Sequence, residues 1–152
     1  MKFCSIFILT LLFVVTISVS SCKMSKKTVE NQKKSLELME VSFEKIGISG
    51  SENLVINSKE RMKTQSNRSG LGEEVKSDIN PKDWNELVAI VYSLNVEEFQ
   101  NMEAPSQERF HDGARATTII IKTADSEIRS QTYDEGKPPA SVKILNDYLE
   151  SL

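Results

Sequence analysis

The sequence predicts an α+β protein, an antiparallel sheet with two main helices packed on one face. Short apolar runs separated by turn residues come first along the chain, and a segment with helical spacing follows them. Two more strand-like runs and a second apolar helix then complete the chain. A sheet covered by helices on one side is the simplest arrangement that buries all of these apolar faces.

Residues 43–49 and 54–56 are the first two predicted strands, and small or polar turn residues separate them. The first run alternates, which places Ile46 and Ile48 together on one face and Lys45 on the other. We expect the apolar face to be the buried one.

A weak third strand is predicted over residues 61–65. The following stretch, residues 66–78, has no apolar period and contains Gly70 and Gly72. This pattern predicts an exposed, mobile loop.

The clearest helix is predicted to begin at Pro81, with Asn80 as its capping residue. A second, short helix is predicted over residues 96–102, with Asn95 as its cap. The first helix buries one stripe of residues at helical spacing: Trp84, Leu87, Val88, Val91 and Leu94.

A β-hairpin is predicted over residues 116–122 and 127–133, because residues 119–121 are three consecutive isoleucines that suit a strand covered on both faces. The last helix is predicted to start at the prolines at 138 and 139. Its inner stripe is Val142, Leu145, Leu149 and Leu152.

The N-terminus carries the most specific motif of the chain. Lys2 precedes an apolar stretch, residues 3–19, that is too short and too interrupted for a typical membrane-spanning helix. Small residues at 19–21 then lead to Cys22. This layout resembles the signal of bacterial lipoproteins, which implies removal of residues 1–21 and acylation of Cys22. An uncleaved anchor and a plain secretory signal are the alternatives.

The lipoprotein resemblance implies an organisation and an address. Residues 22–41 would be the lipidated cysteine and a polar tether, and residues 42–152 a single domain. Because Cys4 leaves with the signal, that domain would contain no thiol. Lys23 follows Cys22, and the enterobacterial sorting rule then permits transfer to the outer membrane. We expect a lipid-anchored protein of the bacterial cell membrane or outer membrane that faces the periplasm.

Composition argues against several functions. Acidic residues exceed basic residues by 22 to 19, which disfavours nucleic acid as a partner. His111 is the only histidine, and the sequence lacks a Gly-rich phosphate loop, a nucleophile elbow and a zinc-binding histidine pair. We therefore predict no enzymatic activity, no catalytic residue, no metal site and no cofactor.

The hairpin topology predicts one polar cluster. The start of the first strand lies beside the end of the second, and a two-residue turn places Arg115 directly across from Asp134. Tyr133 is expected to make an exposed contact there. The candidate binding residues are Arg109, His111, Asp112, Arg115, Tyr133, Asp134 and Glu135. Ordinary structural ion pairs would account for the same residues.

The C-terminal part resembles small lipoproteins of Bacteroidetes-type bacteria that have no assigned activity. The resemblance lies in residues 104–106, 112–114 and 133–139. No acidic run follows Cys22, which departs from the surface-export signal of such bacteria and favours the periplasmic side of a membrane.

We expect a membrane-anchored interaction domain that binds an envelope protein or a cell-wall partner. The expected surface is the open end of the hairpin together with residues 66–78. The alternative is a protein that binds a small ligand or an ion through Asp112, Asp134, Glu135 and His111.

Lipidation of Cys22 is directly testable. In a bacterial membrane fraction, intact-mass spectrometry should give residues 22–152 plus acyl chains, and Cys22→Ala should abolish the lipidated species. An unlipidated mass for the unmodified sequence would contradict the anchor.

Overall fold

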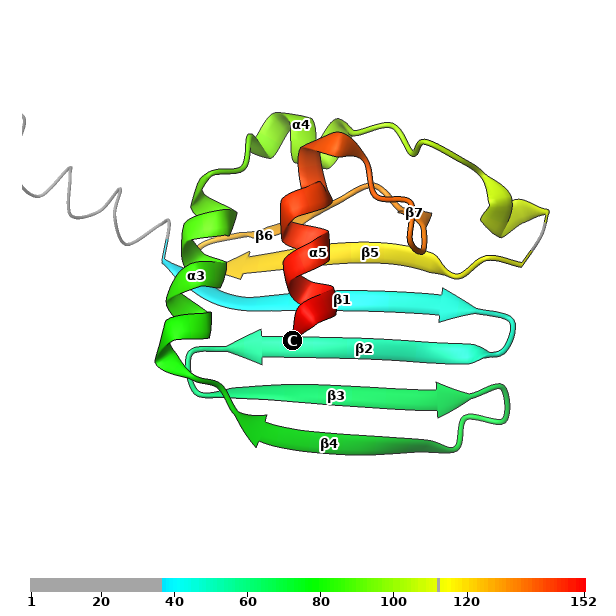
Figure 1. The fold of residues 1–152 in the computed structure, drawn as a ribbon, viewed down its shortest axis with the longest axis horizontal. Helices are drawn as coiled ribbons and strands as arrows, with labels where there is room; N and C mark the ends of the chain where they lie inside the picture. Colours follow the sequence, from blue (N-terminus) through cyan, green and yellow to red (C-terminus); the bar gives the residue numbers. More distant parts are fainter. Residues whose placement is uncertain (1–36, 112) are drawn as a thin grey trace, which may run out of the picture. The chain divides into compact units, whose positions relative to one another are not determined.

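The computed structural model describes residues 37–111 and 113–152, and Figure 1 shows their fold. The predicted signal, Cys22 and most of the predicted tether lie outside the described residues, as does Asp112. The described chain is an antiparallel sheet with helices on one face, which confirms the predicted α+β class. No helix in this part of the chain is long and apolar enough to cross a membrane.

The sheet has seven strands in the order β4-β3-β2-β1-β5-β6, with β7 paired to β5. Strand β1 occupies the middle, between β2 and β5, and both pairings are antiparallel. The strands are β1 (Leu38–Gly47), β2 (Gly50–Asn57), β3 (Glu60–Asn67), β4 (Gly72–Asp78), β5 (Ala116–Thr123), β6 (Glu127–Arg129) and β7 (Tyr133–Asp134).

The helices follow the predicted caps. The Asn80 side chain accepts a hydrogen bond from the Lys82 N–H at 2.9 Å, and the Asn95 side chain accepts from two N–H groups of its helix. Both predicted caps are confirmed. The helices are α3 (Pro81–Tyr92), α4 (Val96–Asn101) and α5 (Lys143–Ser151), with 3₁₀ turns η1 (Glu108–Phe110) and η2 (Ala140–Val142).

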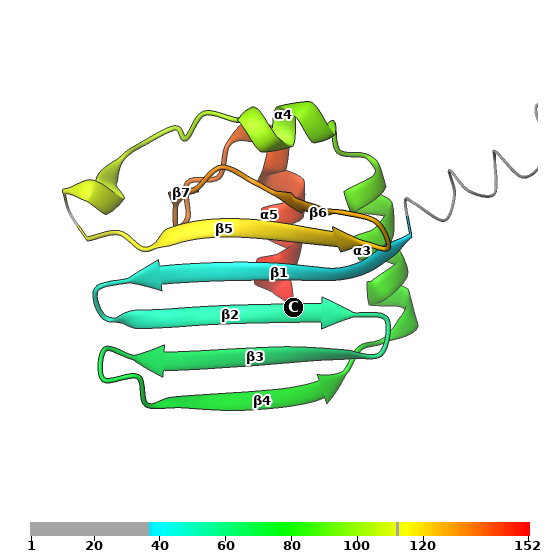
Figure 2. The ribbon, with the colours of Figure 1, turned by 180° about the vertical axis from the view of Figure 1, so that it is seen from behind.

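The core lies between α3, α5 and one face of the sheet. Helices α3 and α5 cross that face in Figure 1, and Figure 2 shows the opposite face without helices. Phe43 of β1 pairs with Ile119 of β5, and both side chains join Leu87 of α3 and Leu145 of α5 in one buried cluster. Alternate residues of each central strand are therefore buried by the helices.

The open face is polar and carries ion pairs between strands. Lys122 of β5 lies 2.8 Å from Glu40 of β1, and Arg129 of β6 lies 3.0 Å from Glu44 of β1. The long side chains cover the sheet where helices do not, and Ile120 is only 6 % exposed on this face. All three isoleucines of residues 119–121 are buried, as predicted.

Two predictions about β1 are wrong. The strand begins at Leu38, so residues 38–41 belong to the sheet rather than to the tether. The buried face is also the reverse of the one expected, because Lys45 is 4 % exposed and Ile46 is 58 % exposed. Phe43 sets the phase of the strand toward the helices, which places Ile46 on the open face of the sheet, and Ile48 lies in the exposed turn after β1.

The mobile loop predicted over residues 66–78 is also wrong, because β4 pairs with β3 from Gly72 to Asp78. All seven residues of β4 are exposed, so this edge strand has no buried face and no apolar alternation to reveal it. The turn before it depends on Asn67, whose side chain accepts the N–H groups of Ser69 and Leu71.

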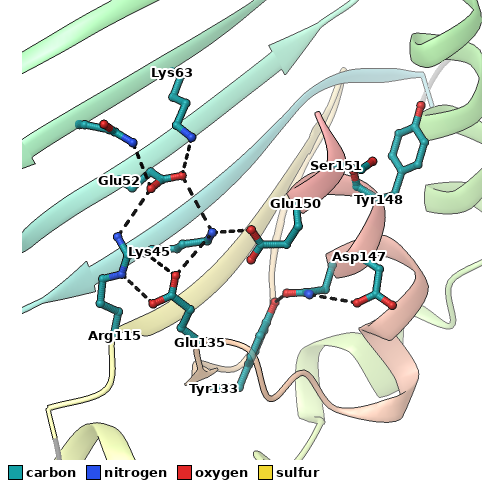
Figure 3. A network of polar contacts seen from close by, with 12 residues as sticks. Lys45, Glu52, Lys63, Arg115, Tyr133, Glu135, Asp147, Tyr148, Glu150 and Ser151 are labelled. Atoms are coloured by element: carbon teal, nitrogen blue, oxygen red, sulfur yellow. Dashed lines mark hydrogen bonds and ion pairs between the residues drawn. The ribbon is translucent and has the colours of Figure 1, made fainter.

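The predicted exposure of Tyr133 is wrong, because its side chain is fully buried. Its hydroxyl donates to the Asn146 side-chain oxygen of α5 at 2.8 Å, and burial raises the pKa of this phenol above its ordinary value. Figure 3 shows the Tyr133 ring pointing toward α5.

We expect Tyr133→Phe to lower the free energy of unfolding by about 1 to 3 kcal/mol, because it leaves the buried Asn146 oxygen without a donor. Denaturant titration measures the loss. Tyr148→Phe is the matched control, since the Tyr148 hydroxyl is only partly buried where it donates to the Asp83 carbonyl. Equal losses in the two variants would contradict the buried role of Tyr133.

Candidate functional site

Three connections meet at one end of the sheet, which we call the hairpin end. They are the β1–β2 turn, the β3–β4 turn, and residues 107–111 and 113–115, which precede β5 in the chain. This end lies at the right in Figure 1 and at the left in Figure 2. The predicted binding surface comprised the open end of the β5 hairpin and residues 66–78. The open end of the hairpin and residues 66–71 lie at this end of the sheet, whereas residues 72–78 lead away from it as β4.

A one-residue shift in strand register rearranges the predicted cluster. The tight turn after β5 is as predicted, and Ile120 pairs with Arg129 in the expected register. At the other end of β5, however, Ala116 pairs with Asp134, whereas the register at Ile120 would pair Ala116 with Tyr133. Ser130 lies at the shift, where its side-chain oxygen accepts the Ile119 N–H.

The shift determines where the candidate residues point. Without it, Arg115 would face Asp134 and Tyr133 would lie on the open face. With it, the Arg115 carbonyl accepts the Glu135 N–H at 2.9 Å, and Tyr133 pairs with Thr117 on the face covered by helices. A one-residue slip moves side chains to the opposite face, which is why both sequence predictions are wrong.

Lys45 is the centre of an ion network near the hairpin end (Figure 3). Its side chain is 5 % exposed, and its Nζ lies 2.6 Å from Glu150, 3.6 Å from Glu135 and 3.9 Å from Glu52. The same nitrogen stands 4.9 Å from the centre of the Phe43 ring. The network therefore ties β1, β2 and the residue that follows β7 to the end of α5.

Arg115 extends the network toward solvent. Its guanidinium makes a two-pronged contact with Glu135, including a 2.7 Å hydrogen bond from Nε, and Nη1 lies 3.6 Å from Glu52. The hydrogen bond from Arg115 lowers the pKa of Glu135, and the same contact raises that of Arg115. Burial raises the pKa of Glu52, but the Lys63 hydrogen bond and the nearby cations bring it below its ordinary value.

Asp134 belongs to a second cluster, whose hydrogen bonds are separate from those of the Lys45 network. The fully buried carboxylate accepts the Ser106 hydroxyl at 2.6 Å, the Glu108 N–H at 2.7 Å and Arg109 Nη1 at 2.9 Å. Burial raises the pKa of Asp134, but these donors hold it far below its ordinary value. Asp134 therefore holds the segment that contains η1 against β7, and its oxygens have donors already.

The predicted candidate residues thus divide into separate groups. Arg115 and Glu135 join the Lys45 network, Arg109 pairs with Asp134, and Tyr133 lies in the core. His111 is exposed at the end of η1. Within the described ranges, no group of three or more His, Cys, Asp or Glu side chains is placed to hold a metal ion.

A cleft of about 570 Å³ opens between the two turns of the hairpin end. The hydroxyls of Ser51 and Ser66 lie 2.7 Å apart across β2 and β3, and Gln65 donates to Glu52 at 3.3 Å. Arg115 also lines the cleft. The cleft is therefore a polar hollow with both charges present, next to the Lys45 network.

Exposed apolar side chains accompany the cleft. Ile48 of the β1–β2 turn is 72 % exposed, Leu71 of the β3–β4 turn 74 %, and Phe110 of η1 67 %. Ile48 also approaches the segment before β5, since its Cδ1 would lie 3.7 Å from a Cβ at Gly113. Apolar groups from all three connections thus reach solvent at this end of the sheet.

Sequence reasoning missed four members of the ion network: Lys45, Glu52, Lys63 and Glu150. Their separation along the chain hides the association, and only the β1–β2 and β2–β3 registers bring the first three together. One local signal was present in the sequence. Lys45 lies two residues after Phe43 in a predicted strand, so the two side chains share the face that the helices cover.

Comparison of the chain with protein-family models, curated proteins and solved structures found no match. The functional interpretation therefore rests on the geometry of the hairpin end and on the N-terminal sequence.

We expect Asp134→Asn to lower the free energy of unfolding at pH 7 by about 1 to 3 kcal/mol, because the charge that holds Arg109 is lost. A carboxylate with a depressed folded pKa stabilises the fold above the unfolded value, about 3.9, and this contribution disappears as the pH falls below it. The stability of Asp134→Asn should therefore decline less steeply in acid.

Denaturant unfolding at several pH values between neutral and strongly acidic conditions measures this difference. Asp125→Asn, in the exposed turn after β5, is the control and should follow the unmodified chain. Parallel pH profiles for Asp134→Asn and the unmodified chain would show that Asp134 contributes no acid sensitivity.

Proposed function

We propose that this chain is a lipid-anchored bacterial envelope lipoprotein whose folded domain is a non-enzymatic binding module for an envelope protein. The observation that carries the proposal is the combination, at the hairpin end, of exposed apolar side chains with a charged cleft. The lipid anchor rests on the N-terminal sequence and on Cys22.

The composition of the hairpin end favours a protein partner. Ile48, Leu71 and Phe110 project from turns rather than from the sheet, so a partner could cover them without unfolding any strand. Apolar contact supplies binding energy, and the neighbouring charges of Arg115 and Glu52 supply orientation. A cell-wall glycan would make less use of aliphatic side chains.

The ionisable groups of the hairpin end support a binding role over a catalytic one. Glu52, Glu135 and Asp134 all have pKa values below their ordinary range because cations or hydroxyl and amide donors contact them. A general base needs a pKa near the working pH, and these carboxylates are displaced in the opposite direction. Their arrangement supports an ionic framework for recognition.

The point at which the chain enters the sheet is consistent with a binding role for the hairpin end. Strand β1 begins at Leu38 and reaches the hairpin end at Gly47, a span of ten residues or about 30 Å. The segment that leads from Cys22 therefore joins the sheet at the end remote from the proposed binding surface.

Site-specific photo-crosslinking in bacterial cells tests the proposal. A benzoylphenylalanine at position 48 or 71 of the full chain should give a discrete adduct with an envelope protein. Position 144 is the matched control, because Ile144 is 73 % exposed on α5, away from the hairpin end. Aspartate substitutions at the same positions give a second comparison. Ile48→Asp should weaken binding of the envelope protein about tenfold, whereas Ile144→Asp should leave its affinity unchanged.

Adducts of equal yield from positions 48, 71 and 144 would indicate nonspecific contact and contradict the proposed surface. Failure of positions 48 and 71 to give any protein adduct would contradict a protein partner at the hairpin end.

A further inference from the structure

Strand β4 is an open edge of the sheet. It pairs with β3 on one side, and no strand of the described chain pairs with its other side. In Figures 1 and 2 no other element extends beyond it, and all seven of its residues are exposed. A second strand can therefore approach this edge.

The hydrogen-bond phase of β4 follows from its pairing with β3. The Ile79 N–H donates to the Lys59 carbonyl, and the Asn67 N–H donates to the Leu71 carbonyl, so the odd-numbered residues direct their backbone groups toward β3. Backbone direction alternates along an antiparallel strand. Glu74 and Lys76 therefore direct their N–H and C=O groups toward the open edge.

The sequence of β4 is complementary to itself in one antiparallel register. When Val75 lies opposite Val75 of a second copy, Glu74 faces Lys76 of that copy and Lys76 faces its Glu74. Each Glu74–Lys76 pair then falls at a hydrogen-bonded position, in agreement with the backbone phase. The two valines, each 61 % exposed in the single chain, meet at the centre.

Neighbouring registers with the same backbone phase are unfavourable. A shift in one direction places Glu74 opposite Glu74, and a shift in the other places Lys76 opposite Lys76 and Glu74 opposite Asp78. Like charges directly across a strand pair are destabilising. The charges that protect an edge from arbitrary strands thus permit one self-pairing.

We propose that two copies of this chain associate through their β4 strands, antiparallel and centred on Val75, to form one continuous sheet. The occupant of the open edge is a second copy of the chain, chosen by the reciprocal Glu74–Lys76 pairing. The pairing is centred on Val75, outside the hairpin-end cleft, although Gly72 and Glu73 at the start of β4 also line that cleft. The proposal does not depend on the proposed partner there.

Disulfide trapping in the full chain tests the register. Under mild oxidation, Val75→Cys should give a covalent dimer, because directly opposed residues of a non-hydrogen-bonded pair lie within disulfide range. Ser77→Cys is the control on the same face, since position 77 would face Glu73 of the other copy, and the two introduced thiols would lie beyond reach of each other. The chain without an introduced cysteine is the control for disulfides that Cys4 and Cys22 form.

A Val75→Cys dimer without a Ser77→Cys dimer supports the proposal. Absence of a Val75→Cys dimer, or equal trapping at both positions, overturns it.

Charge reversal gives an independent test in solution. Sedimentation of the full chain should show a monomer–dimer equilibrium that Glu74→Lys or Lys76→Glu alone weakens about tenfold. A mixture of the two variants should recover association, because every cross-strand pair is again of opposite sign. Association that is unchanged by both variants, or a chain that is monomeric at every concentration, would overturn the β4 dimer.

Discussion

The fold depends on one constraint: helices cover only one face of the sheet. Each central strand must then present apolar side chains to α3 and α5 and polar side chains to solvent. Phe43 and Ile119 meet the helices from neighbouring strands, while the open face is crossed by ion pairs such as Lys122–Glu40. The pairing registers of β1 with β2 and β5 keep apolar side chains on the helix-covered face and polar side chains on the open face. Most of the remaining structure depends on these registers.

The Lys45 network occupies the place where apolar cover gives way to polar surface. Lys45 faces the same side as Phe43, yet the end of α5 offers it Glu150 rather than another apolar group. Glu52 and Glu135 complete its surroundings. A buried ammonium surrounded by carboxylates contributes little net stability but penalises any other register, because a slip would leave its charge unpaired. The network therefore specifies the arrangement at the hairpin end.

The two proposed surfaces lie at different borders of the same sheet. The hairpin end collects the turns, where Ile48 and Leu71 project freely, and β4 forms a long edge beyond the cover of the helices. The two surfaces adjoin at the start of β4, because Gly72 and Glu73 also line the cleft, whereas Val75, the centre of the proposed pairing, does not. Self-association would place two hairpin ends on one assembly, and a multivalent partner would then bind it more tightly than a single domain.

The sequence by itself determined the α+β class, both asparagine helix caps, the tight turn after β5 and the buried isoleucine run, because each depends on local spacing or local hydrogen bonding. It also predicted one surface made of the open end of the β5 hairpin and residues 66–78, but residues 72–78 of that stretch form β4. Tertiary structure alone decided the phase of β1, the identity of β4 and the membership of the ion clusters. Pairing partners set these features: the register shift at Ser130 moves Tyr133 into the core and Glu135 beside Arg115, and β4 exists only through its contact with β3.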